Sequence, residues 1–230
     1  QLIFRGIIHF ILSCDAYPNC YAMSKYLAEF IGTFFLVFVT GLTAGANPSL
    51  MAPALGATWM ALVFLGKTYS QAHYNPAITL GVLIIGKISL KDSGIYVLIQ
   101  LLAGLAAAPL ATWLVQDDSF TFTVEPAGSA NMVEILLAEI FFTFLLVLVV
   151  LTTSFRSHSI KNTDMAPLAI GFAVAVAIYA IYPISGAILN PATGTGPNLA
   201  TLNVEQFIPI WYYWVGPMLG GALAAFVFRV

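Results

Sequence analysis

The chain is a series of long apolar runs separated by short polar stretches. Six runs approach the roughly twenty residues with which a helix crosses about 30 Å of hydrocarbon. They cover residues 27–46, 51–66, 93–115, 131–154, 165–183 and 208–229. The pattern therefore predicts six membrane-spanning helices, of which the second is the weakest because Pro48 and Pro53 delay its start.

Two further apolar runs, 76–86 and 191–201, are too short to cross. At about 1.5 Å per residue each would extend roughly 15 Å, half of the hydrocarbon thickness. Both overlap the same tripeptide, Asn75-Pro76-Ala77 in the first and Asn190-Pro191-Ala192 in the second. Asparagine caps helix amino ends, and proline fits the first helical position because the N–H there lacks a partner in any case. We therefore predict two re-entrant half-helices that begin near the middle of the membrane.

The composition agrees with an all-α membrane protein. Hydrophobic residues make up 60% of the 230 residues and charged residues only 8%, whereas a soluble domain carries about 25% charged residues. The first 24 residues are too short to span and include Arg5 and His9, so we interpret 1–24 as an interfacial segment, with a signal-sequence remnant as the alternative. Two cysteines, Cys14 and Cys20, give no basis for a disulfide or a metal site, and we expect no cofactor.

The chain also contains an internal repeat. AEFIGTFFLVFV (28–39) resembles AEIFFTFLLVLV (138–149), and the two Asn-Pro-Ala tripeptides lie a similar distance apart. The halves are about 26–115 and 131–229, each with three predicted spans and one half-helix. Because three is odd, the second half must enter the membrane upside down, which makes this an inverted repeat. Chance similarity between apolar helices is the alternative, and the shared glutamate and tripeptide speak against it.

The charges predict an orientation. All the lysines and arginines fall on the side of the amino terminus if the half-helices re-enter, whereas the segment between the two halves has none and carries acidic residues. By the positive-inside rule both termini are then cytoplasmic. The basic residues are Arg5, Lys25, Lys67, Lys87, Lys91, Arg156, Lys161 and Arg229, and the acidic residues of the central segment are Asp117, Asp118 and Glu125.

Two inverted half-helices would bring their amino ends together at mid-membrane. Each end carries roughly half a positive charge from its aligned peptide dipoles. The side chains of Asn75 and Asn190 add amide donors to this site. A water molecule could accept hydrogen bonds there, while protons and metal cations would meet a positive field. These properties favour the passage of small neutral molecules.

The chain resembles the aquaporins, the major intrinsic protein family, over about residues 26–229. The resemblance rests on SQAHYNPAITLG, SGAILNPA, the two AE helix starts and WVGPMLGGALAA at 214–225. It implies that 25–230 is one aquaporin-like channel domain, with six helices around a pore in each subunit of a homotetramer. It also implies that Glu29 and Glu139 accept hydrogen bonds from the loops that carry the half-helices, and that His73 lines the pore or packs within its loop.

The resemblance further implies a constriction formed by Leu55, Ile178, Ala187 and Thr193. An arginine usually follows the second Asn-Pro-Ala in this family, and this chain has Thr193 there. The constriction would then be uncharged. Gly194 and the pair Tyr213-Trp214 resemble the water-selective branch, whereas Asn198 fits neither branch.

Three functions stay open at this point. The chain is a passive water channel, a broader channel that also conducts small neutral solutes such as glycerol, urea or ammonia or leaks cations weakly, or a structural, weakly conducting subunit of a larger membrane assembly. We expect no enzymatic activity, because no metal-ligand spacing, phosphate loop or nucleophile elbow is present. The scattered basic residues form no nucleic-acid patch, so the expected partners are the lipid bilayer, water and small solutes.

Overall fold

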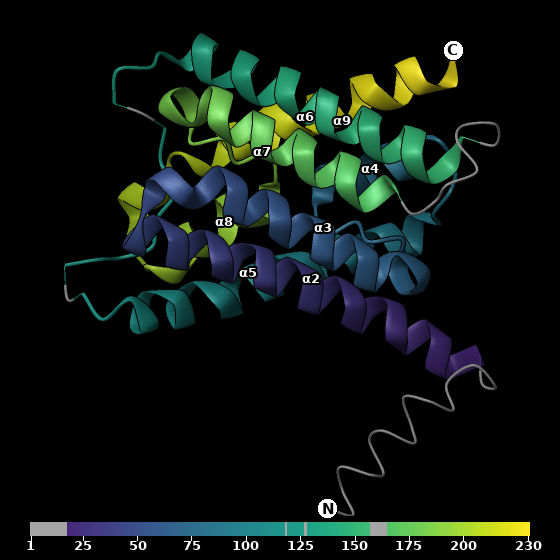
Figure 1. Ribbon diagram of the computed structural model, residues 1–230, viewed down its shortest axis with the longest axis horizontal. Helices are drawn as coiled ribbons and strands as arrows, with labels where there is room; N and C mark the ends of the chain where they lie inside the picture. The colour runs from purple at the N-terminus through teal and green to yellow at the C-terminus, as the bar shows by residue number, and fades with distance from the viewer. Residues whose placement is uncertain (1–17, 118, 127, 157–164) are drawn as a thin grey trace, which may run out of the picture.

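The computed structural model describes residues 18–117, 119–126, 128–156 and 165–230, and its regular structure is helical (Figure 1). Six helical segments are long and apolar enough to cross a membrane, which confirms the predicted fold class. The long helices are α2 (Pro18–Ala46), α3 (Met51–Ser70), α5 (Leu90–Val115), α6 (Met132–Phe155), α7 (Ala166–Ser185) and α9 (Ile210–Arg229). The predicted half-helices are α4 (Pro76–Ile84) and α8 (Pro191–Ala200), and two 3-10 turns, η2 (Pro48–Leu50) and η4 (Val204–Phe207), precede α3 and α9.

Two boundaries differ from the prediction. Helix α3 continues to Ser70, beyond the apolar run that ends at residue 66, because Lys67 lies in its last turn, where a basic side chain interacts favourably with the carboxyl end of a helix. Helix α2 begins at Pro18, so it includes the last part of the segment 1–24. Residues 1–17 lie outside the described residues, and their interfacial placement stays a prediction.

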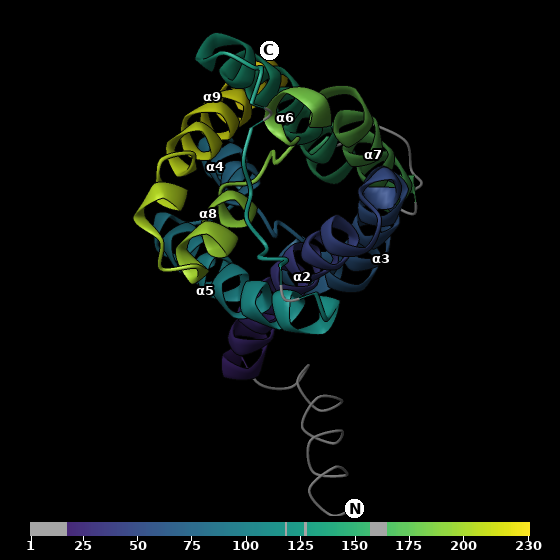
Figure 2. The same cartoon turned by 90° about the vertical axis from the view of Figure 1, so that its left-hand side faces the viewer.

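The long helices form a ring around the two half-helices (Figure 2). Within the ring α2 packs on α5, α3 on α7, and α6 on α9. Half-helix α4 packs against α9, and half-helix α8 packs against α5. Each half-helix is therefore held by the third long helix of the opposite half, so the two halves of the repeat interlock.

Glycines allow these two contacts to be made backbone to backbone. A Cβ atom added at Gly196 of α8 would lie 2.4 Å from the carbonyl carbon of Gly104 in α5. A Cβ atom added at Gly221 of α9 would lie 2.6 Å from the carbonyl oxygen of Ala77 in α4. Small residues of this kind let helices approach closely where no hydrophobic effect drives their association. The half-helices therefore have fixed positions inside the ring.

The two ends of the bundle differ in charge. We call the end that carries the α5–α6 connection, residues 116–131, the linker end, and the opposite end the basic end. Among the described residues, the charged side chains at the linker end are all acidic, namely Asp117, Glu125, Glu134 and Glu205. The described lysines and arginines, Lys25, Lys67, Lys87, Lys91, Arg156 and Arg229, lie toward the basic end, where Lys25 Nζ pairs with Asp92 Oδ1 at 2.9 Å.

Candidate functional site: the junction of the two half-helices

The two Asn-Pro-Ala tripeptides start the two half-helices. Asn75 Oδ1 accepts a hydrogen bond from the Ala77 N–H at 2.8 Å, and Asn190 Oδ1 accepts one from the Ala192 N–H at 3.0 Å. Both asparagines have extended backbones, and Pro76 follows the first as Pro191 follows the second. These are asparagine N-caps followed by proline at the first helical position.

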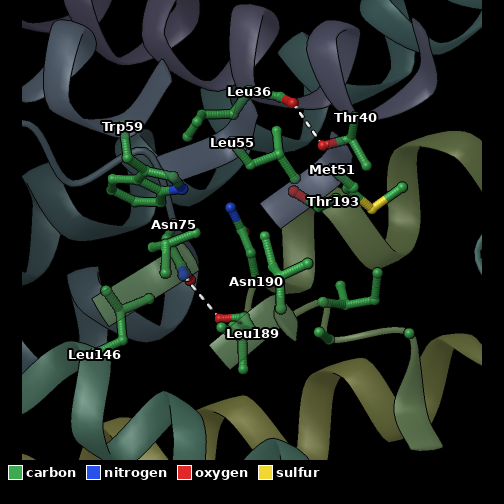
Figure 3. Close-up of a pocket in the computed structure, with 15 residues that line it drawn as sticks. Leu36, Thr40, Met51, Leu55, Trp59, Asn75, Leu146, Leu189, Asn190 and Thr193 are labelled. Atoms are coloured by element: carbon green, nitrogen blue, oxygen red, sulfur yellow. Dashed lines mark hydrogen bonds between the residues drawn. The ribbon is translucent and has the colours of Figure 1, made fainter. Parts of the chain in front are cut away.

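The two asparagines also link the halves of the repeat. The Asn75 Nδ2 group donates to the Leu189 carbonyl oxygen at 2.8 Å (Figure 3). In the reverse direction, Asn190 Nδ2 donates to the Tyr74 carbonyl oxygen at 3.0 Å. Each amide has two N–H groups, so one N–H of each is committed to the opposite loop. No sequence pattern indicates this reciprocal cross-link.

The backbone before each asparagine is strained in the same way. Ala72 and Tyr74 have positive φ angles of 54° and 52°, and Ala187 and Leu189 have angles of 53° and 55°. Non-glycine residues rarely adopt this left-handed region, and it persists only where surrounding contacts hold it. The two halves of the repeat therefore have matching φ angles at these positions of the junction.

Two buried glutamates supply the holding contacts. Glu29 on α2 accepts hydrogen bonds from the backbone N–H groups of His73 and Tyr74, at 2.9 and 2.6 Å. Glu139 on α6 accepts from the N–H groups of Ile188 and Leu189, at 3.0 and 2.7 Å. Both glutamates are fully buried. Each carboxylate thus binds two consecutive N–H groups of a strained loop.

We predict that Glu139→Gln folds more stably than Glu139→Leu. Glutamine keeps one acceptor oxygen, which can retain the bonds that Oε1 receives from Ser185 Oγ and the Ile188 N–H. Leucine leaves every donor at this site unpaired, and each buried unpaired group costs about 1–3 kcal/mol. Thermal unfolding of the purified variants in detergent measures the difference. Equal unfolding temperatures would exclude a loop-holding role for the carboxylate.

Two further pairs of residues support the loops, and their supporting role was not predicted from the sequence. Ser70 Oγ accepts from the Ala72 N–H and Ser185 Oγ from the Ala187 N–H, each at 3.1 Å. The hydroxyls of Tyr96 and Tyr213 donate to the carbonyl oxygens of Ser70 and Ser185, at 3.2 and 2.9 Å. A signal for the serines was present, since each stands the same number of residues before its asparagine. The tyrosines lie on distant helices, and no local pattern indicates their role.

A small cavity lies beside the paired asparagines, on their linker-end side. Its volume is about 30 Å³, which is room for about one or two water molecules. The structure brings together here the four residues of the expected constriction, Leu55, Ile178, Ala187 and Thr193. Asn75 and Asn190 line the same cavity, as Figure 3 shows. The lining is otherwise largely apolar and includes Leu36, Thr40, Met51, Trp59, Leu146 and Val174.

Comparisons with known proteins agree with this architecture. The family model described as "Major intrinsic protein" matches residues 18–228. The chain belongs to the major intrinsic protein family. Members of this family are membrane channels, so the chain is an integral, multi-pass membrane protein of the channel type.

Individual relatives of this major intrinsic protein have similar lengths. The chain is 34% identical to the probable aquaporin TIP2-2 of Oryza sativa subsp. japonica, over 90% of this chain and 87% of the relative. It is 29% identical to Aquaporin Z of Rhodopseudomonas palustris, over 90% and 92% of the two chains. The X-ray structure of the aquaglyceroporin from Plasmodium falciparum superposes with a TM-score of 0.78 at 21% identity, over 90% of this chain and 96% of that one. The last likeness shows the shared fold.

In this major intrinsic protein His73 is buried and contacts residues of α4 and α5. Only 1% of the residue is exposed, its Nδ1 atom lies 3.1 Å from Thr79 Oγ1, and its ring meets the edge of Tyr96. The residue is not among those that line the cavity beside the asparagines. A pore-lining role for His73 therefore stays a prediction.

Asn198, which fits neither branch of the family, holds the α5–α6 connection, which we call the linker. Its Oδ1 atom accepts from the Val124 N–H at 2.7 Å and its Nδ2 group donates to the Val124 carbonyl oxygen at 2.9 Å. Asn198 is fully buried and Val124 is 5% exposed. The Phe122 N–H adds a bond to Thr112 Oγ1 at 3.2 Å. The linker is thus fixed across the linker end of the ring, where Figure 2 shows it.

We predict that Asn198→Ala lowers the unfolding temperature. The substitution leaves a buried N–H and a buried carbonyl of Val124 without partners, which costs about 1–3 kcal/mol. Thr123→Ala is the matched control, because it changes a neighbouring linker residue and should alter stability by about 0.5 kcal/mol or less. Unfolding of both variants in detergent gives the comparison. If the two variants unfold at the same temperature, the proposed stabilising role of the two Asn198–Val124 hydrogen bonds is contradicted.

Proposed function

We propose that this protein is a passive channel for water that also conducts small neutral solutes such as glycerol, urea or ammonia. One observation carries the proposal: the amides of Asn75 and Asn190 line one cavity at the amino ends of two half-helices. One N–H of each amide holds the opposite loop. The second N–H of each is the group that we assign to a passing water or solute molecule.

The same arrangement would exclude protons and metal cations. Two helix amino ends place about half a positive charge each at the junction. Water that accepts a hydrogen bond from an asparagine amide is oriented by that bond, and a cation approaching the site meets the positive ends of both dipoles. We propose that this field is the main electrostatic barrier, because the constriction residues Leu55, Ile178, Ala187 and Thr193 carry no charge.

We also propose an orientation and an assembly. The basic end faces the cytoplasm, as the positive-inside rule requires, and both termini lie on that side. The channel assembles as a homotetramer with one pore in each subunit, as the family resemblance implies. It has no catalytic activity and needs no cofactor. In the bilayer, the apolar side chains exposed on the outside of the ring contact lipid or neighbouring subunits.

Shrinkage of proteoliposomes tests the solute range. Vesicles that contain the purified protein are mixed rapidly with hyperosmotic sucrose, glycerol or urea, and light scattering records their volume. We expect fast shrinkage in sucrose, followed in glycerol and urea by re-swelling that empty liposomes lack. Absence of protein-dependent re-swelling would restrict the channel to water among these permeants. Shrinkage at the lipid rate in every solution would instead support the structural, weakly conducting subunit.

A further inference from the structure

One face of α3 lines the small cavity beside the asparagines. Met51, Leu55 and Trp59 follow one another at intervals of four residues, and all three line this cavity. Four residues are about one helical turn, or roughly 6 Å along the axis. Because α3 begins at the linker end, Trp59 lies one turn deeper in the channel than Leu55, which belongs to the expected constriction.

The junction fixes the position of the Trp59 ring. The ring centroids of Trp59 and Tyr74 are 6.2 Å apart, at an interplanar angle of 53°. Tyr74 is itself held, because its carbonyl oxygen accepts the hydrogen bond from Asn190 Nδ2. Its side chain fills the space beside Gly32 and Gly66, where an added Cβ atom would collide with it. The indole of Trp59 therefore packs against a residue that has no room to shift.

The indole N–H of Trp59 is a hydrogen-bond donor that has no partner in the described part of the chain. Trp59 is only 6% exposed, and a buried indole N–H usually finds a partner. Figure 3 shows the indole nitrogen turned into the cavity, toward the space that holds the Asn190 amide. A molecule in the cavity is thus the group that can accept this hydrogen bond.

Trp59 is also the largest side chain of the cavity lining. It is the aromatic residue among the described residues that line the cavity. Aromatic side chains each bury about 150–250 Å², whereas the cavity has a volume of only about 30 Å³. The indole ring therefore determines much of the space that a molecule beside the asparagines can occupy.

We propose that Trp59 is a specificity-determining residue of the channel: its ring limits the size of the molecules that pass the asparagines, and its N–H donates to their oxygen atoms. The side chains of the expected constriction offer one hydroxyl, from Thr193, and no aromatic ring. Selection then takes place one helical turn deeper than that constriction. The specificity role rests on the proposed conduction, while the donor geometry does not.

Size is tested first, by light scattering of proteoliposomes in hyperosmotic glycerol and sucrose. Trp59→Leu removes the ring and keeps an apolar side chain. A single methylene group in a fitted apolar site already changes discrimination by about tenfold, so we expect the glycerol-to-water flux ratio to rise by about tenfold or more. Trp59→Phe keeps a smaller ring and should raise the ratio less. It is the second variant, for the case that Trp59→Leu does not fold.

Trp113→Leu is the matched control for the size test. It makes the same substitution on the outer surface of the helix ring, where Trp113 is 72% exposed. This variant should keep the native flux ratio. If a folded Trp59→Leu or Trp59→Phe variant also keeps the native ratio, the size role is overturned.

The donor is tested second, by NMR of the native protein in detergent, labelled with ¹⁵N at the indole nitrogen of tryptophan. The measurement is the hydrogen exchange of each indole N–H with solvent, and single Trp→Phe variants assign the resonances. Trp214 is the internal control, because its Nε1 donates to Thr195 Oγ1 at 2.9 Å. A bonded N–H exchanges only when its bond opens, so we expect Trp59 to exchange about tenfold faster than Trp214, or more.

The two tests separate the possible failures. Exchange at Trp59 as slow as at Trp214 overturns the donor role. Native protein that conducts neither water nor glycerol contradicts the proposed function, and the specificity role falls with it. Hydrogen exchange still decides in that case whether the Trp59 N–H faces the cavity.

Discussion

Replacing Thr193 by arginine is expected to lower the flux of urea and glycerol more than the flux of water. Thr193 lines the cavity of about 30 Å³ together with Leu55, Ile178 and Ala187. An arginine there would fill space that larger solutes need and would add fixed donors that water can still use. Its charge would also reduce any cation leak, because the native cavity lining has no basic residue to repel cations.

A second variant separates size from charge. Thr193→Gln adds bulk and amide donors at the same position without a charge, so it should lower solute flux while leaving a cation leak unchanged. The solute-to-water flux ratio of native and variant liposomes gives the first comparison, and the decay of a potassium gradient gives the second. A native ratio near zero that neither substitution alters would show that Leu55 and Ile178 already close the channel to solutes larger than water.

Replacing Gly196 by alanine is expected to prevent stable folding. The added methyl group would lie 2.4 to 2.7 Å from three backbone atoms of Gly104. Because backbone atoms cannot rotate away, α8 or α5 would have to shift. Overpacking of this kind commonly costs about 1–3 kcal/mol and occasionally more, and the backbone clash places this case at the upper end or beyond. The yield of monodisperse protein and its unfolding temperature in detergent are the measurements.

Gly94→Ala is the matched control for this prediction. Gly94 lies in α5, as Gly104 does. Apart from its chain neighbours and the adjacent helix backbone, no atom lies within 4 Å of a Cβ added there. Alanine in an open helical position should stabilise by about 0.5–1 kcal/mol. If Gly196→Ala folds as well as Gly94→Ala, the close seating of α8 on α5 is contradicted.

The helices and their inverted arrangement could be predicted from the sequence because each depends on local or repeated patterns. Apolar length gives the spans, and Asn-Pro gives the start of each half-helix at Pro76 and Pro191. The repeat then gives the symmetry. Hydropathy predicts too early an end for α3, because it falls at Lys67 although the helix continues to Ser70.

The contacts that fix the junction depend on residues far apart in the chain. Asn75 donates to Leu189 in the other half of the repeat, and Asn198 binds Val124 in the connection between the halves. Tyr213 supports the turn at Ser185 from another helix. No periodicity or spacing indicates such pairs, because each partner is a backbone group that every residue possesses. The sequence therefore indicates the asparagines and glutamates as candidates. It indicates neither the reciprocal hydrogen bonds of Asn75 and Asn190 nor the pairing of Asn198 with Val124.

Water is expected to pass through the cavity between Thr193 and the two asparagines. The most direct test compares the osmotic water permeability of native liposomes, Thr193→Trp liposomes and empty liposomes. The cavity has a volume of only about 30 Å³, so the indole would fill it. We expect the native permeability to be well above that of empty liposomes, and the permeability of correctly folded Thr193→Trp to be near that of empty liposomes. Native protein at the lipid background, or a folded Thr193→Trp variant that conducts water as fast as native protein, would contradict it.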